Sequence, residues 1–212
     1  MDVYAAINAR QTIRDFSEQA IEPTLIERII SAGMAAPTNN HLREWHFVLL
    51  QDAAKRQELL AQVIHPLNKQ DSIRVVDSWG MTDEVQREMY VDAIPKQYRM
   101  LATSACLMLP CFRQESDLLR PETLSSLNGL ASMWCCIENM LVAAAAEGVF
   151  GVLRIPGENE RSVIKRFLGI PGSYEIPCYL ALGYPAEQAR RARQTEIDLN
   201  ERIHYDRWRT EE

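Results

Sequence analysis

Apolar residues recur at helical spacing in three segments of the chain. The segment 22–36 places its apolar residues on one face of a helix, with Pro23 at a first-turn position that a helix tolerates. The segment 158–170 shows the same amphipathic pattern, and 126–147 is apolar nearly all round, which is typical of a buried central helix. The pattern therefore predicts two amphipathic helices and one core helix.

Short apolar runs predict four strands between and around these helices. They cover residues 45–50, 104–112, 151–155 and 176–185. Pro110 lies inside the second run, and we expect it to end the regular pairing of that strand or to place the strand at an edge. Because strands alternate with helices, the pattern by itself favours α/β layers over a β-sandwich.

Residues 65–98 do not fit this alternation. They are polar with scattered aromatic residues, and we interpret them as an insertion of helices and loops that covers another part of the molecule. Trp79, Tyr90 and Tyr98 could form an aromatic lid over a substrate. The alternative is that they only pack the insertion onto the body.

The tail after Pro185 is also unusual. It is rich in charge, begins with a cluster of arginines at 190–193 and has too few apolar residues for a core of its own. Ile203, Tyr205 and Trp208 are its apolar anchors. We expect this tail to lie across another surface, such as that of a partner subunit.

Composition and charge limit the class of protein. The chain has 212 residues, a formal net charge of −6 and a pI near 5.4, which suits one globular domain over residues 1–212. The acidic balance argues against binding to nucleic acid or to an anionic membrane. The uninterrupted apolar runs are shorter than the roughly 20 residues that cross a bilayer, and the first residues lack the layout of a signal peptide. We therefore expect a cytoplasmic protein without a membrane span.

Several kinds of catalytic and metal site find no support in the sequence. The five cysteines include no CxxC pair and are interpreted as small buried residues, and the four histidines show no HExxH spacing, so we expect no metal site. No GxGxxG follows a strand, and neither a P-loop nor a GxSxG elbow is present. Arginine side chains would therefore have to hold any anionic ligand.

Arg10, Thr12 and Arg14 are the first candidates for such a role. Alternate residues of an extended segment point the same way, so two guanidinium groups and a hydroxyl could converge on a phosphate or on an electron-rich ring edge. The alternative is a solvated loop in which these arginines pair with Asp15 or Glu18.

Six sequence stretches, in order, are similar to the FMN-dependent nitroreductase family: RQTIRDF, APT, WHFV, SMWCCIENMLVAAAAEG, LGIPGSYEIPCYLALGYPAE and ERIHYDRW. The resemblance implies an α+β fold of three layers, with a central, mostly antiparallel sheet flanked by helices. It also implies a homodimer with two FMN sites at the interface. The C-terminal arm, 186–212, would wrap the partner, and 65–98 would be an insertion that could serve as a lid.

The resemblance also implies which residues bind the cofactor. It matches Arg10 and Thr12 to the FMN phosphate and ribityl chain, Arg14 and Arg99 to the flavin N1/O2 edge, Pro37, Thr38 and Asn39 to the ring of the partner's site, Gly157 and Glu158 to the backbone near N5, and Arg191 and Arg193 to the phosphate. The implied activity passes electrons from NAD(P)H through the flavin to a nitroaromatic, a quinone or a similar acceptor. No catalytic side chain is expected, because the cofactor carries the chemistry and an arginine supplies only a fixed charge.

The match departs from the family pattern after APT. The family commonly has Asn, any residue, Gln and Pro before Trp, whereas this chain has His41, Leu42, Arg43 and Glu44 before Trp45. An exposed Arg–Glu pair on a loop would explain the change without a new catalytic role. The departure also keeps an alternative open, a protein that sequesters or senses FMN without efficient turnover. The family includes reductive dehalogenases and flavin-fragmenting enzymes as well, and the insertion leaves room for a specialised substrate.

Overall fold

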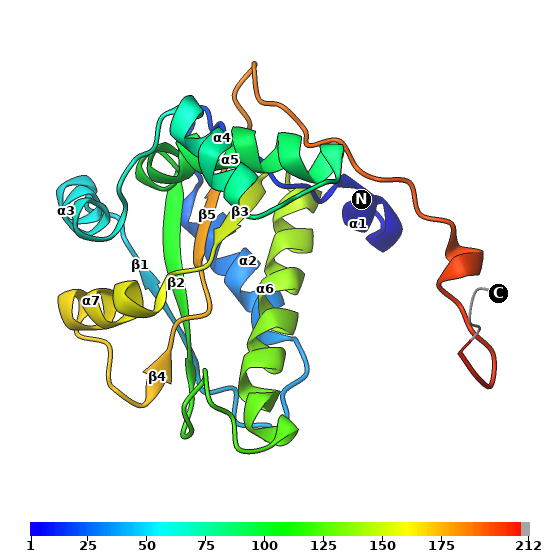
Figure 1. Cartoon of the computed structure of the whole chain (residues 1–212). Helices are drawn as coiled ribbons and strands as arrows, with labels where there is room; N and C mark the ends of the chain where they lie inside the picture. Colours follow the sequence, from blue (N-terminus) through cyan, green and yellow to red (C-terminus); the bar gives the residue numbers. More distant parts are fainter. Residues whose placement is uncertain (209–212) are drawn as a thin grey trace.

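The computed structural model describes residues 1–208 and contains one five-stranded sheet among helices (Figure 1). The elements in chain order are α1 (Val3–Ala9), α2 (Pro23–Met34), β1 (Trp45–Leu49), α3 (Ala53–Val63), α4 (Lys69–Ser78), α5 (Glu84–Ala102), β2 (Cys106–Arg113), the short 3-10 helix η1 (Leu124–Leu127), α6 (Asn128–Ala146), β3 (Phe150–Arg154), α7 (Glu158–Leu168), β4 (Tyr174–Glu175), β5 (Tyr179–Gly183) and the 3-10 helix η2 (Leu199–Glu201).

The sheet is antiparallel throughout. Its strands run in the order β1-β2-β5-β3, and β4 pairs with the far end of β2. The alternation of helices and strands therefore predicts the layers correctly but not the strand directions. The class is α+β, as the family resemblance implies, rather than α/β.

Pro110 lies within a central strand, not at an edge. Leu107 and Arg113 make backbone hydrogen bonds with residues next to β1, so the even-numbered residues between them, including Pro110, face the other neighbour of β2. On that side, pairing with β5 ends at Met108 and pairing with β4 begins at Phe112. The predicted interruption of pairing is thus confirmed on one side of the strand only. Neither β5 nor β4 pairs with Pro110 on that side, so its missing N–H leaves no carbonyl of these strands without a donor.

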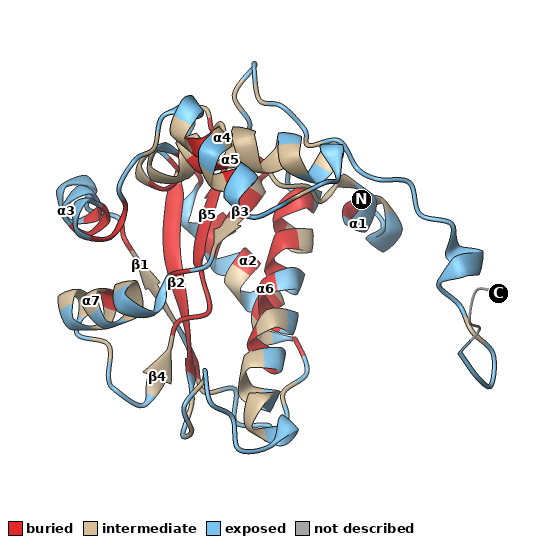
Figure 2. Ribbon diagram, in the orientation of Figure 1, coloured by how far each residue is buried: buried red, intermediate tan, exposed pale blue. Residues whose placement is uncertain are grey.

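Two hydrophobic cores lie on the two faces of the sheet and make the fold three-layered. On one face, Met108 and Phe112 of β2 pack with residues of α2 and α6. On the other face, Leu107 and Cys111 pack with residues of α3, α5 and α7. Both central strands are buried on both faces (Figure 2), which explains why they read as continuous apolar runs in the sequence.

The core helix α6 approaches its neighbours closely at two glycines. A Cβ at Gly33 of α2 would lie 2.5 Å from Cγ of Met140, and a Cβ at Gly151 of β3 would lie 2.7 Å from Cδ2 of Leu141. The segment Leu124–Ala146 is long and apolar enough to cross a membrane by length and composition alone. In this fold its apolar residues pack against α2 and the sheet, as those of a core helix do.

The predicted insertion is mostly helical. Residues 65–98 contain α4 and most of α5, which together form a hairpin at one end of the molecule (Figure 1). The tail leaves β5, passes this hairpin and then extends away from the body beyond α1. Its anchors Ile203, Tyr205 and Trp208 are exposed in the single chain, and the ring of Trp208 stacks on that of His204.

Candidate functional site

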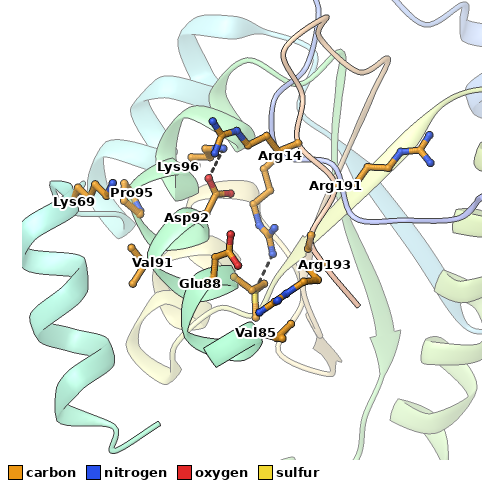
Figure 3. Close-up of a pocket in the computed structure, with 13 residues that line it drawn as sticks. Arg14, Lys69, Val85, Glu88, Val91, Asp92, Pro95, Lys96, Arg191 and Arg193 are labelled. Carbon is orange, nitrogen blue, oxygen red and sulfur yellow. Dashed lines mark hydrogen bonds and ion pairs between the residues drawn. The ribbon is translucent and has the colours of Figure 1, made fainter. Parts of the chain in front are cut away.

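Two adjoining hollows lie beside the α4–α5 hairpin. The first, about 430 Å³, is bounded by α4, α5 and the tail (Figure 3), and we call it the basic hollow. It is lined by six basic side chains and only two acidic ones: Arg14, Lys69, Lys96, Arg190, Arg191 and Arg193 against Glu88 and Asp92. The second, about 380 Å³, lies between α5 and β3 and is called the aromatic hollow. Arg14 and Met89 line both, so these two side chains mark the boundary between them.

Arg14 is half-buried, and its hydrogen bonding is poorly satisfied. Among residues 1–208, its one hydrogen bond runs from Nη2 to the thioether sulfur of Met89 at 3.3 Å. A thioether is a weak acceptor, and a guanidinium has five N–H donors. Desolvation lowers the pKa of Arg14, although Asp92 and Asp15 oppose the shift. A cation in this state favours an oxygen- or nitrogen-rich ligand that could accept its remaining hydrogen bonds.

The backbone around Arg14 is fixed on both sides. Before it, Thr12 forms an isolated parallel bridge with Gly151 at the start of β3. After it, Phe16 bridges to Pro185, and its ring lies where a Cβ at Gly183 would stand, at 2.6 Å. Arg14 is therefore held across the ends of β3 and β5, at the edge of both hollows.

Lys96 of α5 joins this segment to the hairpin. Its Nζ lies 2.7 Å from Asp15 and 2.8 Å from Asp92. Burial disfavours the charged amine, but the hydrogen bonds to the two aspartates outweigh it and raise the pKa of Lys96. The two aspartates thus already balance the charge of Lys96, whereas Arg14 forms no ion pair with any of the described residues.

The aromatic hollow is lined largely by apolar and aromatic side chains. Trp79, at the C-terminal end of α4, packs edge-to-face against Tyr90 of α5, with ring centroids 5.4 Å apart. Leu153 and Ile155 of the β3 segment line it as well. This lining suits a planar, mainly apolar ring system with a polar edge toward Arg14.

Arg154 also lines the aromatic hollow, but its hydrogen bonds are used within the protein. It makes a bidentate pair with Glu160 at 2.6 and 2.7 Å, donates to Gln97 at 3.0 Å and lies over the ring of Tyr179. It therefore joins β3, α5 and α7 structurally. The sequence analysis missed this residue, although a charged residue in a buried strand six positions before a glutamate was a usable signal.

The structure brings together some of the residues predicted to bind the cofactor. Arg14, Arg191 and Arg193 line one hollow, although Arg14 is about 180 positions from the other two in the sequence. Arg193 has a loose ion pair with Glu84 at 3.9 Å. Arg10 lines neither hollow, because it caps α1 and lies 3.3 Å from a carboxylate oxygen of Glu138 on α6.

The other predicted residues lie outside the two hollows of the single chain. Arg99 is exposed in the last turn of α5, and Lys96 and Gln97 of the same helix line the hollows instead. Gly157 and Glu158 are exposed where α7 begins, just after Ile155. Pro37, Thr38 and Asn39 follow α2, and the backbone N–H of Asn39 donates to Ser132 of α6 at 3.3 Å.

The segment that departs from the family pattern has an unusual backbone. His41 and Arg43 have φ angles of 61° and 45°, a left-handed conformation that residues other than glycine adopt rarely. Asn40 accepts a hydrogen bond from the N–H of Leu42 at 3.1 Å, and Glu44 pairs with Arg113 at 2.9 Å. The Arg–Glu pair expected on this loop is thus formed by Glu44 with a β2 arginine and not with Arg43.

Four of the five cysteines are buried as expected, and the interpretation as a buried residue is wrong for Cys135. Burial raises the pKa of Cys106 to about 11 and those of Cys111 and Cys136 to about 12, and Cys178 is shifted in the same direction. Cys135 is exposed on α6. Within residues 1–208, no three His, Cys, Asp or Glu side chains are grouped so that they could hold a metal ion.

Comparison with known proteins identifies the family to which this chain belongs. The model of the nitroreductase family matches residues 7–184, and the chain therefore belongs to that family. A relative from Haliscomenobacter hydrossis, named iodotyrosine deiodinase, is 35% identical over 193 residues, which cover 89% of this chain and 81% of the relative. A protein named NADH dehydrogenase from Thermus thermophilus is 23% identical over 203 residues, which cover 89% of each.

A solved structure extends the likeness of fold to nearly the whole chain. Oxidized iodotyrosine deiodinase, bound to FMN and 3-iodo-L-tyrosine, superposes with a TM-score of 0.73. The superposition covers 98% of this chain and all of that one, at 13% sequence identity. The insertion and the tail are thus included in the shared fold.

Proposed function

We propose that this protein is an FMN-dependent oxidoreductase that takes electrons from NAD(P)H and passes them to an electron-poor small molecule. The observation that carries the proposal is the state of Arg14, a half-buried guanidinium with one weak hydrogen bond, between a basic hollow and an aromatic one. FMN has the matching parts: an anionic phosphate at the end of its ribityl chain, and a planar ring system with one edge rich in acceptors.

The residues of both hollows suit this cofactor. Arg191 and Arg193 would bind its phosphate, with Arg10 completing that site if its pair with Glu138 opens. Trp79, Tyr90 and the β3 segment would enclose the ring. Arg14 would bind the N1–C2=O edge.

When bound, FMN supplies the hydride chemistry, and the protein contributes binding and charge. Arg14 provides a fixed positive charge at the ring edge on which two-electron reduction places negative charge. Because an arginine keeps its proton, this charge persists through turnover. The apolar side chains that would contact the ring would displace water from part of it, which strengthens the electrostatic interaction.

A homodimer is part of the proposal. Val3, Tyr4 and Ile7 of α1 are exposed, as are the apolar residues of the extended tail, and a second copy could cover both surfaces. In such a dimer, Pro37, Thr38 and Asn39 would belong to the partner's flavin site, which agrees with their position outside the hollows of their own chain. Size-exclusion chromatography with light scattering tests this, since a monomer at micromolar concentration contradicts it.

The function is tested by reconstitution and turnover. The protein is titrated with FMN and its visible spectrum recorded, and oxidation of NADH and NADPH is then followed with a nitroaromatic, a quinone or 3-iodotyrosine as acceptor. Turnover well above the rate of free FMN supports the oxidoreductase. A protein that takes up no FMN at micromolar concentration refutes the proposal.

A second candidate is a protein that binds FMN without efficient turnover. The left-handed conformations of His41 and Arg43 favour it, because this segment follows the residues that would contact the partner's flavin. Bound FMN whose reduction by NADH and NADPH is no faster than that of free FMN would select this alternative.

A further inference from the structure

The basic hollow holds more positive charge than one FMN phosphate requires. Among residues 1–208, Lys96 is balanced by two aspartates, one of which also lines the hollow, and Arg193 has a loose pair with Glu84. Lys69 and Arg190 are exposed and have no hydrogen bond or ion pair from their side chains within the described residues. If Arg191 and Arg193 bind the flavin phosphate, these two cations remain unassigned.

Lys69 lies on the opposite side of the hollow from Arg191 and Arg193. Figure 3 shows it beside Pro95, whereas Arg191 and Arg193 lie on the other side of Asp92. The backbone of Lys69 is well fixed, because it begins α4 directly after Asn68, whose side chain caps the helix by accepting from the N–H of Asp71 at 2.9 Å.

The length of α4 separates Lys69 from Trp79. Lys69 begins the helix and lines the basic hollow, and Trp79 caps its other end and lines the aromatic hollow. At 1.5 Å per residue, the ten steps between them give a backbone separation of about 15 Å. A small aromatic acceptor that packs against Trp79 is too short to contact Lys69 as well. A nicotinamide dinucleotide can contact both, because its phosphates lie well away from its nicotinamide ring.

We propose that Lys69 and Arg190, which both line the basic hollow, provide a subsite for the phosphate groups of the reducing dinucleotide, while its nicotinamide stacks on the flavin ring held in the aromatic hollow. This inference rests on the proposed function and adds to it a recognition site for the electron donor. Two exposed cations attract an anion over several ångströms and release it easily, which suits a donor that must leave before the acceptor enters.

The test measures turnover with three hydride donors in the FMN-loaded native protein and in the FMN-loaded double variant Lys69→Ala/Arg190→Ala. The donors are NADPH, NADH and 1-benzyl-1,4-dihydronicotinamide, which has no phosphate. We expect KM for the dinucleotides to rise about tenfold, since each exposed cation contributes on the order of three- to fivefold. Rates with the benzyl compound should not change. Lys55→Ala, which removes an exposed lysine on α3, is the control and should alter none of the three.

The outcomes separate two sources of phosphate. A loss confined to NADPH assigns the subsite to the 2′-phosphate, and an equal loss for NADH and NADPH assigns it to the pyrophosphate. A change below twofold for both dinucleotides overturns the inference, as does an equal loss with the benzyl compound. Because the visible spectrum reports bound FMN in each variant, failure of the subsite is distinguished from failure of the proposed function.

Discussion

Replacement of Arg14 by glutamine removes the one charge that lies between the two hollows. The side chain shortens by little and stays polar, so the fold should persist. In the native protein, desolvation lowers the pKa of Arg14 without removing its charge, and its hydrogen bonding is poorly satisfied. We therefore expect the FMN-free variant to unfold at the same denaturant concentration as the native protein or a higher one.

The effect on the loaded protein should be large and specific. A unit charge about 4 Å from the flavin edge interacts by about 4 kcal/mol at an effective dielectric constant of 20. Loss of one donor to a developing anion commonly lowers rates by about 10² to 10³. This rate loss corresponds to about 2.7 to 4 kcal/mol. For a two-electron couple, about 1.4 kcal/mol corresponds to 30 mV, so we expect the midpoint potential to fall by roughly 60 to 85 mV.

Anaerobic stopped-flow reduction by NADH and spectroelectrochemistry measure both quantities. Arg14→Lys is the matched variant, because it keeps the charge but loses the planar donor fork, and it should lie between the native protein and Arg14→Gln. The reasoning is refuted if Arg14→Gln binds FMN while its potential shifts by less than about 15 mV and its reduction slows by less than about threefold.

Three further predictions concern the stability of the fold. Gly33→Val should lower the free energy of unfolding by about 1 to 3 kcal/mol in urea titrations, because its Cβ would fall 2.5 Å from Cγ of Met140; an unchanged midpoint would show that the two helices can separate freely. Tyr179→Phe should raise stability by about 1 kcal/mol, since the buried hydroxyl has no hydrogen-bond partner among residues 1–208, and clear destabilisation in the same titration would contradict this. Because the pKa of Lys96 is raised above 10.5 in the folded state, its stabilising contribution is complete below pH 10.5 and is lost as the pH rises through the folded value. Between pH 10 and 12 the native protein should therefore lose more stability than Lys96→Met, and parallel pH profiles would exclude this contribution.

The sequence predicts the elements whose periodicity is strong. The core helix, the amphipathic helices and the four long strands all lie within a few residues of their expected ranges. Helix α3 was not predicted, because its buried face consists of Leu59, Leu60 and Val63 with the charged Arg56 at the remaining position, which breaks the apolar pattern. Strand direction could not be read from the alternation of elements, since antiparallel neighbours here are far apart in the sequence.

Prediction of the site was limited by how far the hollow extends along α5. Glu88, Asp92 and Lys96 recur every four residues and line the basic hollow, whereas Arg99 lies on the same side of the helix but in its last turn, beyond the end of the hollow, and is exposed. Pro95 lies inside α5, and because proline ordinarily ends or kinks a helix, the continuity of α5 through Lys96 is hard to read from the sequence. The convergence of Arg14 with the tail arginines depends on contacts across the chain and could be inferred only through the family resemblance.

Titration of the FMN-free protein with FMN, followed by visible absorption and calorimetry, tests the central claim most directly. The account predicts a yellow complex with one FMN per chain, a dissociation constant in the micromolar range or below, and affinity at least tenfold weaker for Arg191→Ala/Arg193→Ala. Absence of binding at micromolar FMN, or binding that the loss of both tail arginines leaves unchanged, would contradict it.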